Sequence, residues 1–208
     1  MSGNEFREFG GHTSCYLLEA AGQTLILDAG SGLIRAPVSL AKPATLLLSH
    51  PHIDHLVGLG MYAPAFAASP QLRLLVPARS DDEARSIIDA LYAPPLWPVK
   101  LTEYKGLEVA ALPDTLALGE LEISHVEGNH PGGCRAFKIR LGDKSMVYAS
   151  DYECSKCSFE RLVELCRGAN LVLFGAQYSE DEYDAHRGFG HATPQVGLEL
   201  MHQSGAAR

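Results

Sequence analysis

The chain has 208 residues, 46% of them hydrophobic and 20% charged, which predicts a single globular domain over residues 1–208 with its own core. Its formal net charge of −8 argues against a large polyanion such as nucleic acid, without excluding one, and favours a small substrate. Its five cysteines are odd in number and scattered, which does not suggest the disulfide framework typical of small secreted proteins.

We expect a chain without an export signal or a membrane-spanning segment. Residues 1–7 lack an apolar signal region, and no later stretch is long and apolar enough to cross a bilayer, so we expect a cytoplasmic protein without a membrane partner. A hairpin, two strands, a helix and a further strand are predicted at residues 15–19, 24–28, 45–49, 72–76, 81–91 and 107–112. Ser80 or Asp81 is expected to cap the helix.

The second half alternates strands and helices. A strand, a second hairpin, a helix, a strand and a helix are predicted at residues 121–126, 136–141, 144–149, 158–166, 171–174 and 194–203. Pro194 in the first turn favours the start of the last helix. Strands that come first and then alternate with helices predict the α/β class, with helices covering a mixed sheet.

A dense group of metal-ligand side chains follows the apolar strand 45–49. Three histidines and one aspartate stand within six residues, namely His50, His52, Asp54 and His55. Imidazole and carboxylate groups suit zinc better than calcium or magnesium. One tetrahedral ion does not readily accept so many ligands from so short a turn. We therefore expect two neighbouring divalent ions, one bound by His50 and His52 and the other by Asp54 and His55; a chance cluster of histidines is the alternative.

Two further ligand candidates stand near the ends of predicted strands. His130 lies in a glycine-rich bend after strand 121–126, and Asp151 follows strand 144–149. A carboxylate in such a position could bridge two ions. Taken alone, His130 could be structural and Asp151 a turn residue, but the histidine-rich motif favours a metal role for both.

One more histidine lies in the loop before the last helix, in the run Gly190-His191-Ala192-Thr193. As a general acid, His191 could protonate a leaving oxygen. The alternative is a histidine that ties down a glycine-rich loop.

Together these motifs resemble the metallo-β-lactamase fold, and within it the phosphodiesterase branch related to ribonuclease Z and the cyclic-nucleotide phosphodiesterases. The Gly-His-Ala-Thr run and the run Ala176-Gln177-Tyr178 favour this branch over lactamases, lactonases and glyoxalase-type thioesterases. The matching stretches follow the family's order and span nearly the whole chain, at residues 10–15, 27–32, 50–59, 129–133, 148–151, 176–178 and 190–193.

The resemblance implies an α/β (α+β) fold, a four-layer αββα sandwich with a two-metal site at one edge. In that site Asp151 would bridge the ions, and His191 would be a catalytic residue near the leaving group. The other ligands would be divided into His50, His52 and His130 for one ion, and Asp54, His55 and a later histidine for the other.

The chain departs from the family pattern in two respects. The later histidine would follow the last predicted helix on one more strand, and a first strand would precede residue 10; we find neither and expect a chain clipped at both ends. His186 and His202 are poor substitutes for the missing ligand. Gly175 stands where related sequences carry an acidic residue, which could otherwise support the proton donor.

The expected reaction is metal-assisted hydrolysis of a small phosphodiester, such as a cyclic nucleotide. Two divalent ions, expected to be zinc with manganese or iron as alternatives, would lower the pKa of a bound water to about 7. Asp54 and Asp151 would position the hydroxide, and His191 would protonate the departing oxygen.

Two other functions fit the same motifs. A lactone or thioester hydrolase on the same fold would not need His191 as a proton donor. A catalytically silent metal-binding protein would fit the missing ligand and Gly175. A homodimer is left open, by analogy with the family alone.

Overall fold

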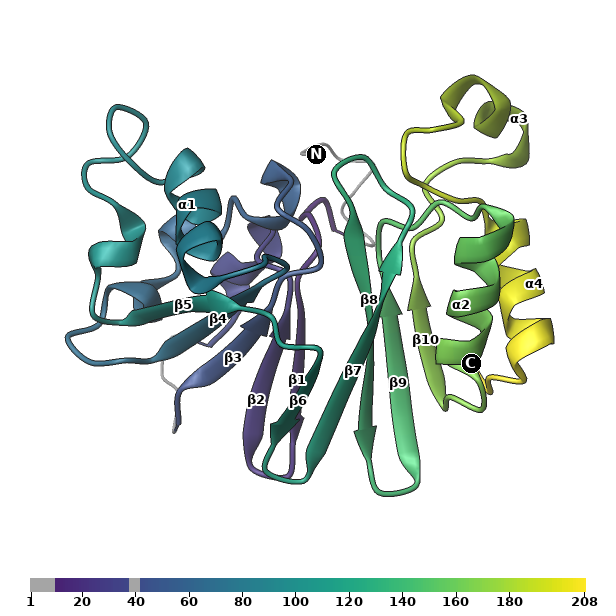
Figure 1. The fold of residues 1–208 in the computed structure, drawn as a ribbon, viewed down its shortest axis with the longest axis horizontal. Helices are drawn as coiled ribbons and strands as arrows, with labels where there is room; N and C mark the ends of the chain where they lie inside the picture. The colour runs from purple at the N-terminus through teal and green to yellow at the C-terminus, as the bar shows by residue number, and fades with distance from the viewer. Residues whose placement is uncertain (1–9, 38–41) are drawn as a thin grey trace. The chain divides into compact units, whose positions relative to one another are not determined.

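The computed structural model describes residues 10–37 and 42–208 (Figure 1). The predictions that residues 1–7 carry no signal region and that a first strand is absent concern residues outside these ranges. The chain divides into two compact units, residues 1–112 and 113–208, each with its own sheet and core. Two mixed sheets with helices confirm the predicted α/β class, while a single domain over the whole chain stays a prediction.

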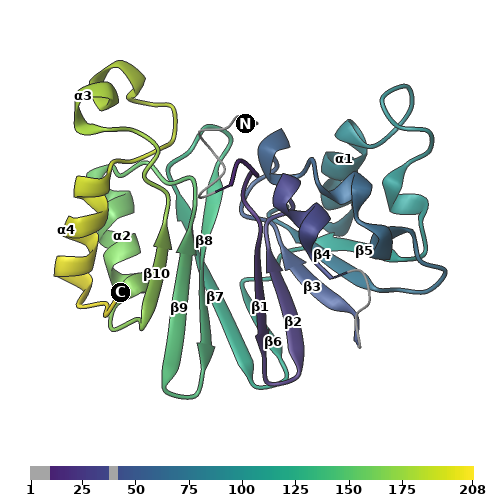
Figure 2. The ribbon, with the colours of Figure 1, turned by 180° about the vertical axis from the view of Figure 1, so that it is seen from behind.

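The first unit is built on a five-stranded sheet in the order β1-β2-β3-β4-β5 (Figures 1 and 2). β1 and β2 form the predicted antiparallel hairpin, and β2 to β5 run parallel, so the residues after β2 and β3 lie at the same edge. The strands are β1 Tyr16–Ala20, β2 Gln23–Leu27, β3 Ala44–Leu47, β4 Leu72–Val76 and β5 Leu107–Ala111.

Helix α1, Asp81–Leu91, packs on this sheet beside β5. The predicted cap is Ser80, whose side chain accepts a hydrogen bond from the backbone N–H of Glu83. Ala84 and Ile88, one turn apart, are fully buried in the core of the unit. Short 3₁₀ helices fill the connections, at η2 Ser31–Arg35, η3 Ile53–His55, η4 Leu59–Met61, η5 Ala63–Phe66 and η6 Leu101–Glu103.

The buried strand β3 supports the histidine-rich loop, so its packing is expected to matter for stability. We expect Leu46→Ala to lower the free energy of unfolding by about 2–5 kcal/mol, because Leu46 is fully buried and truncation leaves a cavity. Urea unfolding followed by circular dichroism measures the change. Leu17→Ala, at a side chain 40% exposed on β1, is the control, with a change within about 0.5 kcal/mol. Equal changes in the two variants would contradict the prediction.

The second unit is built on a sheet in the order β10-β9-β8-β7-β6, in which β9 and β10 are parallel and the other neighbours antiparallel. The carboxyl ends of β7 and β9 therefore lie at the same edge. The strands are β6 Thr115–Leu118, β7 Leu121–Gly128, β8 Cys134–Leu141, β9 Lys144–Ala149 and β10 Leu171–Phe174. Strand β6 was not predicted, because its residues do not form a run of large apolar side chains like the four of β10.

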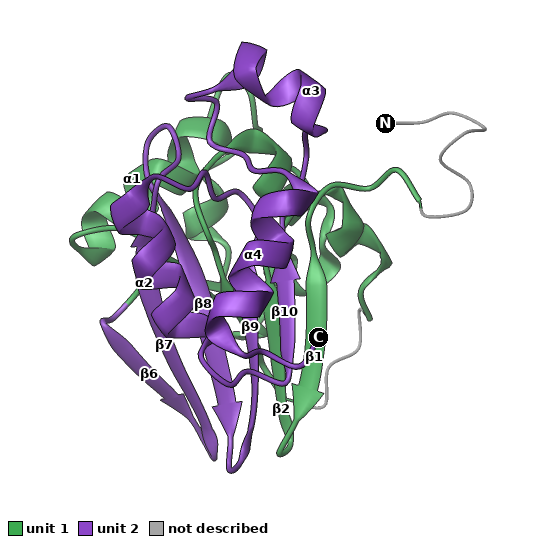
Figure 3. Ribbon diagram, turned by 90° about the vertical axis from the view of Figure 1, so that its right-hand side faces the viewer, with its two compact units in different colours: residues 1–112 green, residues 113–208 purple. Residues whose placement is uncertain are grey.

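Helices α2, Lys156–Cys166, and α4, Pro194–Ser204, lie side by side on one face of this sheet (Figure 3). Leu162 of α2 and Leu200 of α4 are fully buried in its core. The short helices α3, Glu180–Tyr183, and η7, Asp184–His186, were not predicted. Within the described ranges, no helix is long and apolar enough to span a membrane.

Candidate metal centre

A buried carboxylate organises the histidine-rich loop of the first unit. Asp28 follows β2 directly and is fully buried. Its Oδ1 accepts a hydrogen bond from the Ser49 backbone N–H at 2.6 Å, and its Oδ2 accepts from Ser49 Oγ at 2.7 Å and from His55 Nδ1 at 2.7 Å. These three donors compensate the cost of burying the charge. The end of β2 is thereby tied to the loop that follows β3.

The same contacts set the tautomers of two histidines. The Ser49 hydroxyl gives its only proton to Asp28, so it must accept from His50 Nδ1, which lies 3.0 Å away. His55 Nδ1 in turn donates to Asp28. When neutral, both rings therefore carry the proton on Nδ1 and the lone pair on Nε2, the arrangement that a metal-binding histidine needs.

In that tautomer the Nε2 lone pair of His55 faces the carboxylate of Asp54. His55 Nε2 lies 3.4 Å from Asp54 Oδ2, close enough for the two atoms to share a cation, either the proton of an imidazolium or a metal ion. An imidazole nitrogen and a carboxylate oxygen are both ordinary zinc ligands, so these two residues would suit such an ion. The hydrogen bond from a protonated His55 lowers the pKa of the Asp54 carboxyl to about 2, so this group is ionised at neutral pH.

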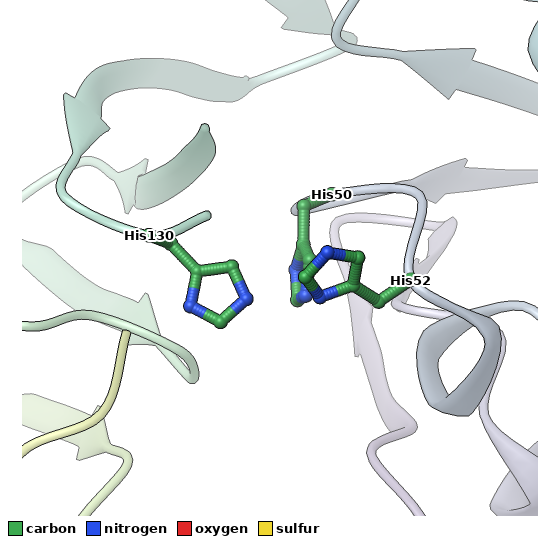
Figure 4. A group of neighbouring side chains, drawn as sticks. All are labelled: His50, His52 and His130. Atoms are coloured by element: carbon green, nitrogen blue, oxygen red, sulfur yellow. The ribbon is translucent and has the colours of Figure 1, made fainter. Parts of the chain in front are cut away.

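His52 completes the set of the first unit. Its ring extends from the same loop as His50, with the ring centroids 4.5 Å apart and the planes at 79° (Figure 4). The His50 and His55 centroids are 4.2 Å apart. All four predicted residues of the motif are thus brought together at the end of β3.

The glycines around this loop allow the backbone segments to pack closely. A Cβ on Gly30 would lie 2.5 Å from the carbonyl oxygen of Ser14, and one on Gly58 would lie 2.1 Å from the carbonyl oxygen of Gly30. The segment after β2 therefore lies directly against the histidine-rich loop, with no room for side chains. Close backbone packing explains these glycines.

The second unit holds a comparable pair, His130 and Asp151. His130 is buried two residues after β7, and its Nδ1 lies 2.9 Å from the carbonyl oxygen of Gly190. A carbonyl oxygen only accepts, so Nδ1 carries the proton and a neutral ring has its lone pair on Nε2. That Nε2 lies 4.0 Å from Asp151 Oδ2, so a lone pair again faces a carboxylate.

His191 lies beside the same carboxylate. Its Nδ1 is 3.8 Å from Asp151 Oδ2, and its ring centroid is 5.4 Å from that of His130. The ring of Tyr178 packs against it at 83°, with the centroids 5.7 Å apart. The structure thus brings together the three predicted residues of the second unit.

Close backbone packing explains why position 175 is a glycine. A Cβ at this position would lie 1.5 Å from the carbonyl oxygen of Ser150, where β9 and β10 end side by side. An acidic side chain at position 175 would require the backbone to shift. His186 and His202, the substitutes considered for the missing ligand, belong to no group of three candidate ligands among the described residues.

Two important carboxylates escaped sequence reasoning. For Asp28 the sequence offered a clue to a role near the site, because this polar residue comes at the end of an apolar strand. For Glu153 it offered none, since only the fold shows that it is 5% exposed and bonded to the loop before His191. Both position candidate site residues without being predicted ligands.

Comparisons with known proteins identify the family of this chain. The model of the Beta-lactamase superfamily domain matches residues 23–208. Ribonuclease Z of Ignicoccus hospitalis is 24% identical over 237 aligned positions, which cover 91% of this chain and 78% of that protein.

Two solved structures are similar in fold. The metallo-beta-lactamase fold protein YhfI of Bacillus subtilis has a TM-score of 0.71 and 20% identity, covering 94% of this chain and 75% of that one. The short form of human tRNase Z has a TM-score of 0.65 and 18% identity, covering 94% and 83%. Since the family model covers most of the chain and the predicted resemblance is confirmed, this protein belongs to the beta-lactamase superfamily and has the metallo-β-lactamase fold.

Proposed function

We propose that this protein is a dinuclear metal-dependent phosphodiesterase that hydrolyses a small phosphodiester, such as a cyclic nucleotide, in the cytoplasm. One observation carries the proposal: three histidines present Nε2 because Nδ1 of each is bonded to a protein oxygen. These are His50, His55 and His130. Two of these Nε2 atoms face a carboxylate, as expected of ligands that share a cation.

The proposed ligands are divided as the family resemblance implies. One ion would be bound by His50, His52 and His130, and the other by Asp54 and His55, with Asp151 shared between them. Nitrogen donors with a few carboxylates fit zinc, with manganese or iron as alternatives. When bound, such ions supply a hydroxide at neutral pH and polarise the phosphoryl oxygens.

The protein's own side chains would orient the metal ligands and protonate the leaving oxygen. Asp28 holds His55 directly and His50 through Ser49, which keeps the lone pair of both rings on Nε2. His191 would give a proton to the departing oxygen, because it lies beside Asp151 without being held in a short hydrogen bond to it.

Metal content and turnover test this function together. We expect about two zinc ions per chain by plasma mass spectrometry and hydrolysis of bis-p-nitrophenyl phosphate. A chelator should abolish turnover, and added zinc should restore it. One ion without turnover would support the silent metal-binding protein instead. Hydrolysis of a lactone or thioester but not of the diester would support the other hydrolase.

The relative named ribonuclease Z raises RNA as a second candidate substrate. The net charge of −8 argues against it, because RNA binding requires many basic contacts to phosphates. Comparing turnover of a cyclic nucleotide and of a precursor tRNA separates the two. A homodimer is proposed by family analogy only.

A further inference from the structure

A buried glutamate holds the loop that carries His191. The Glu153 carboxylate is 5% exposed and accepts three hydrogen bonds. Its Oε1 accepts from the Gly188 backbone N–H at 2.7 Å and from the Tyr183 hydroxyl at 3.1 Å, and its Oε2 accepts from the Gly190 N–H at 3.0 Å. Tyr183 is the last residue of α3, and the two glycines lie on the segment between α3 and His191. A single carboxylate thus closes a loop about 35 residues away in sequence.

Gly190 connects this carboxylate to a proposed metal ligand. Its N–H donates to Glu153, and its carbonyl oxygen accepts from His130 Nδ1 at 2.9 Å. Its φ is 90°, in the region that favours glycine, and a Cβ would lie 1.9 Å from His130 Nδ1. No other residue fits here without displacing the imidazole, so the position of Gly190 fixes the tautomer and the position of His130.

His191 lies between two anchored neighbours. Gly190 before it is bonded to Glu153, and Ala192 after it pairs with Ala176 in a parallel β-bridge. Glu153 is itself anchored, because its backbone N–H donates to the carbonyl oxygen of Asn129 at 2.9 Å. Glu153 therefore links the bend that carries His130 with the loop that carries His191.

We propose that Glu153 is a positioning residue that keeps His191 in place to protonate the leaving group and keeps His130 oriented toward the metal. The proposal rests on the proposed phosphodiesterase function. Glu153 belongs to neither group of candidate metal ligands among the described residues. Glu153 acts through the backbone of Gly188 and Gly190, because its carboxylate accepts a hydrogen bond from each of the two amide N–H groups.

Glu153→Gln tests this role with two substrates that differ in their need for a proton. Glutamine has one acceptor oxygen, so its NH₂ group would face one of the two glycine N–H groups. We expect kcat for diphenyl phosphate to fall roughly 10- to 100-fold with little change in KM. The fall for bis-p-nitrophenyl phosphate should be smaller, because p-nitrophenolate leaves without a proton. Glu164→Gln, at an exposed glutamate of α2 paired with Arg167, is the control and should change neither rate.

Hydrogen exchange, which does not depend on turnover, tests the positioning role of Glu153 separately from the proposed phosphodiesterase function. The amides of Gly188 and Gly190 should exchange hydrogen faster in Glu153→Gln than in the wild type, while the amides of β8 stay unchanged. If the wild type hydrolyses no diester but these amides respond, the proposed function fails and the loop contact stands. Unchanged glycine exchange, or an unchanged kcat for diphenyl phosphate, would overturn the positioning role. If the glutamine variant does not fold, Glu153→Asp, too short to reach both amides, should show the same pattern.

Discussion

Replacing His191 with alanine is expected to lower kcat for diphenyl phosphate by roughly 10²- to 10⁴-fold, the range typical of a lost general acid. The imidazole lies 3.8 Å from the proposed bridging carboxylate of Asp151 and is 17% exposed, so it can reach both the site and a substrate. The loss for bis-p-nitrophenyl phosphate should be much smaller. Steady-state kinetics with both substrates at saturating zinc measure the difference.

The control for this variant is His125→Ala. His125 Nε2 bonds the carbonyl oxygen of Pro113 at 3.0 Å, and the residue belongs to no predicted site, so its loss should leave both rates unchanged. An equal loss for His191→Ala on diester and ester substrates, or no loss on the diester, would contradict the proton-donor role. Either result would favour the lactone or thioester hydrolase.

The second large effect is expected for Asp28→Asn, which removes the acceptor that fixes two histidine tautomers. The amide NH₂ would face the Ser49 hydroxyl and His55 Nδ1, so His55 would have to carry its proton on Nε2. The Ser49 hydroxyl would turn its own proton toward His50 Nδ1, and His50 would change in the same way. We expect zinc affinity to fall roughly 10- to 100-fold or more, since both Nε2 lone pairs are lost.

Competition between the protein and a chromophoric chelator measures this affinity. Asp89→Asn is the matched control, because Asp89 is a half-buried aspartate of the same unit that bonds Thr102 and Lys100 and touches no histidine. Its zinc affinity should equal that of the wild type. Zinc affinity preserved in Asp28→Asn would show that Asp28 does not set the tautomers.

Most elements of the fold were predicted from local patterns. The strand 72–76 and the helix 81–91 match the structure, because a buried parallel strand is continuously apolar and an amphipathic helix repeats every three to four residues. The misses include β6, α3 and η7. β10, which also has four residues, was predicted because all four are large and apolar, and the missed segments have no such run.

The candidate site divides in a similar way. The sequence by itself predicted which side chains could bind a metal. It also determined that His50, His52, Asp54 and His55 share one loop, because proximity along the chain guarantees proximity in space. Only the tertiary structure decided which ring nitrogen of each histidine is presented. The tautomers depend on oxygen atoms of Ser49, Asp28 and Gly190. Asp28 lies 27 residues from His55, and Gly190 lies 60 residues from His130. Contacts of that kind arise from strand pairing and loop closure, and no local pattern encodes them.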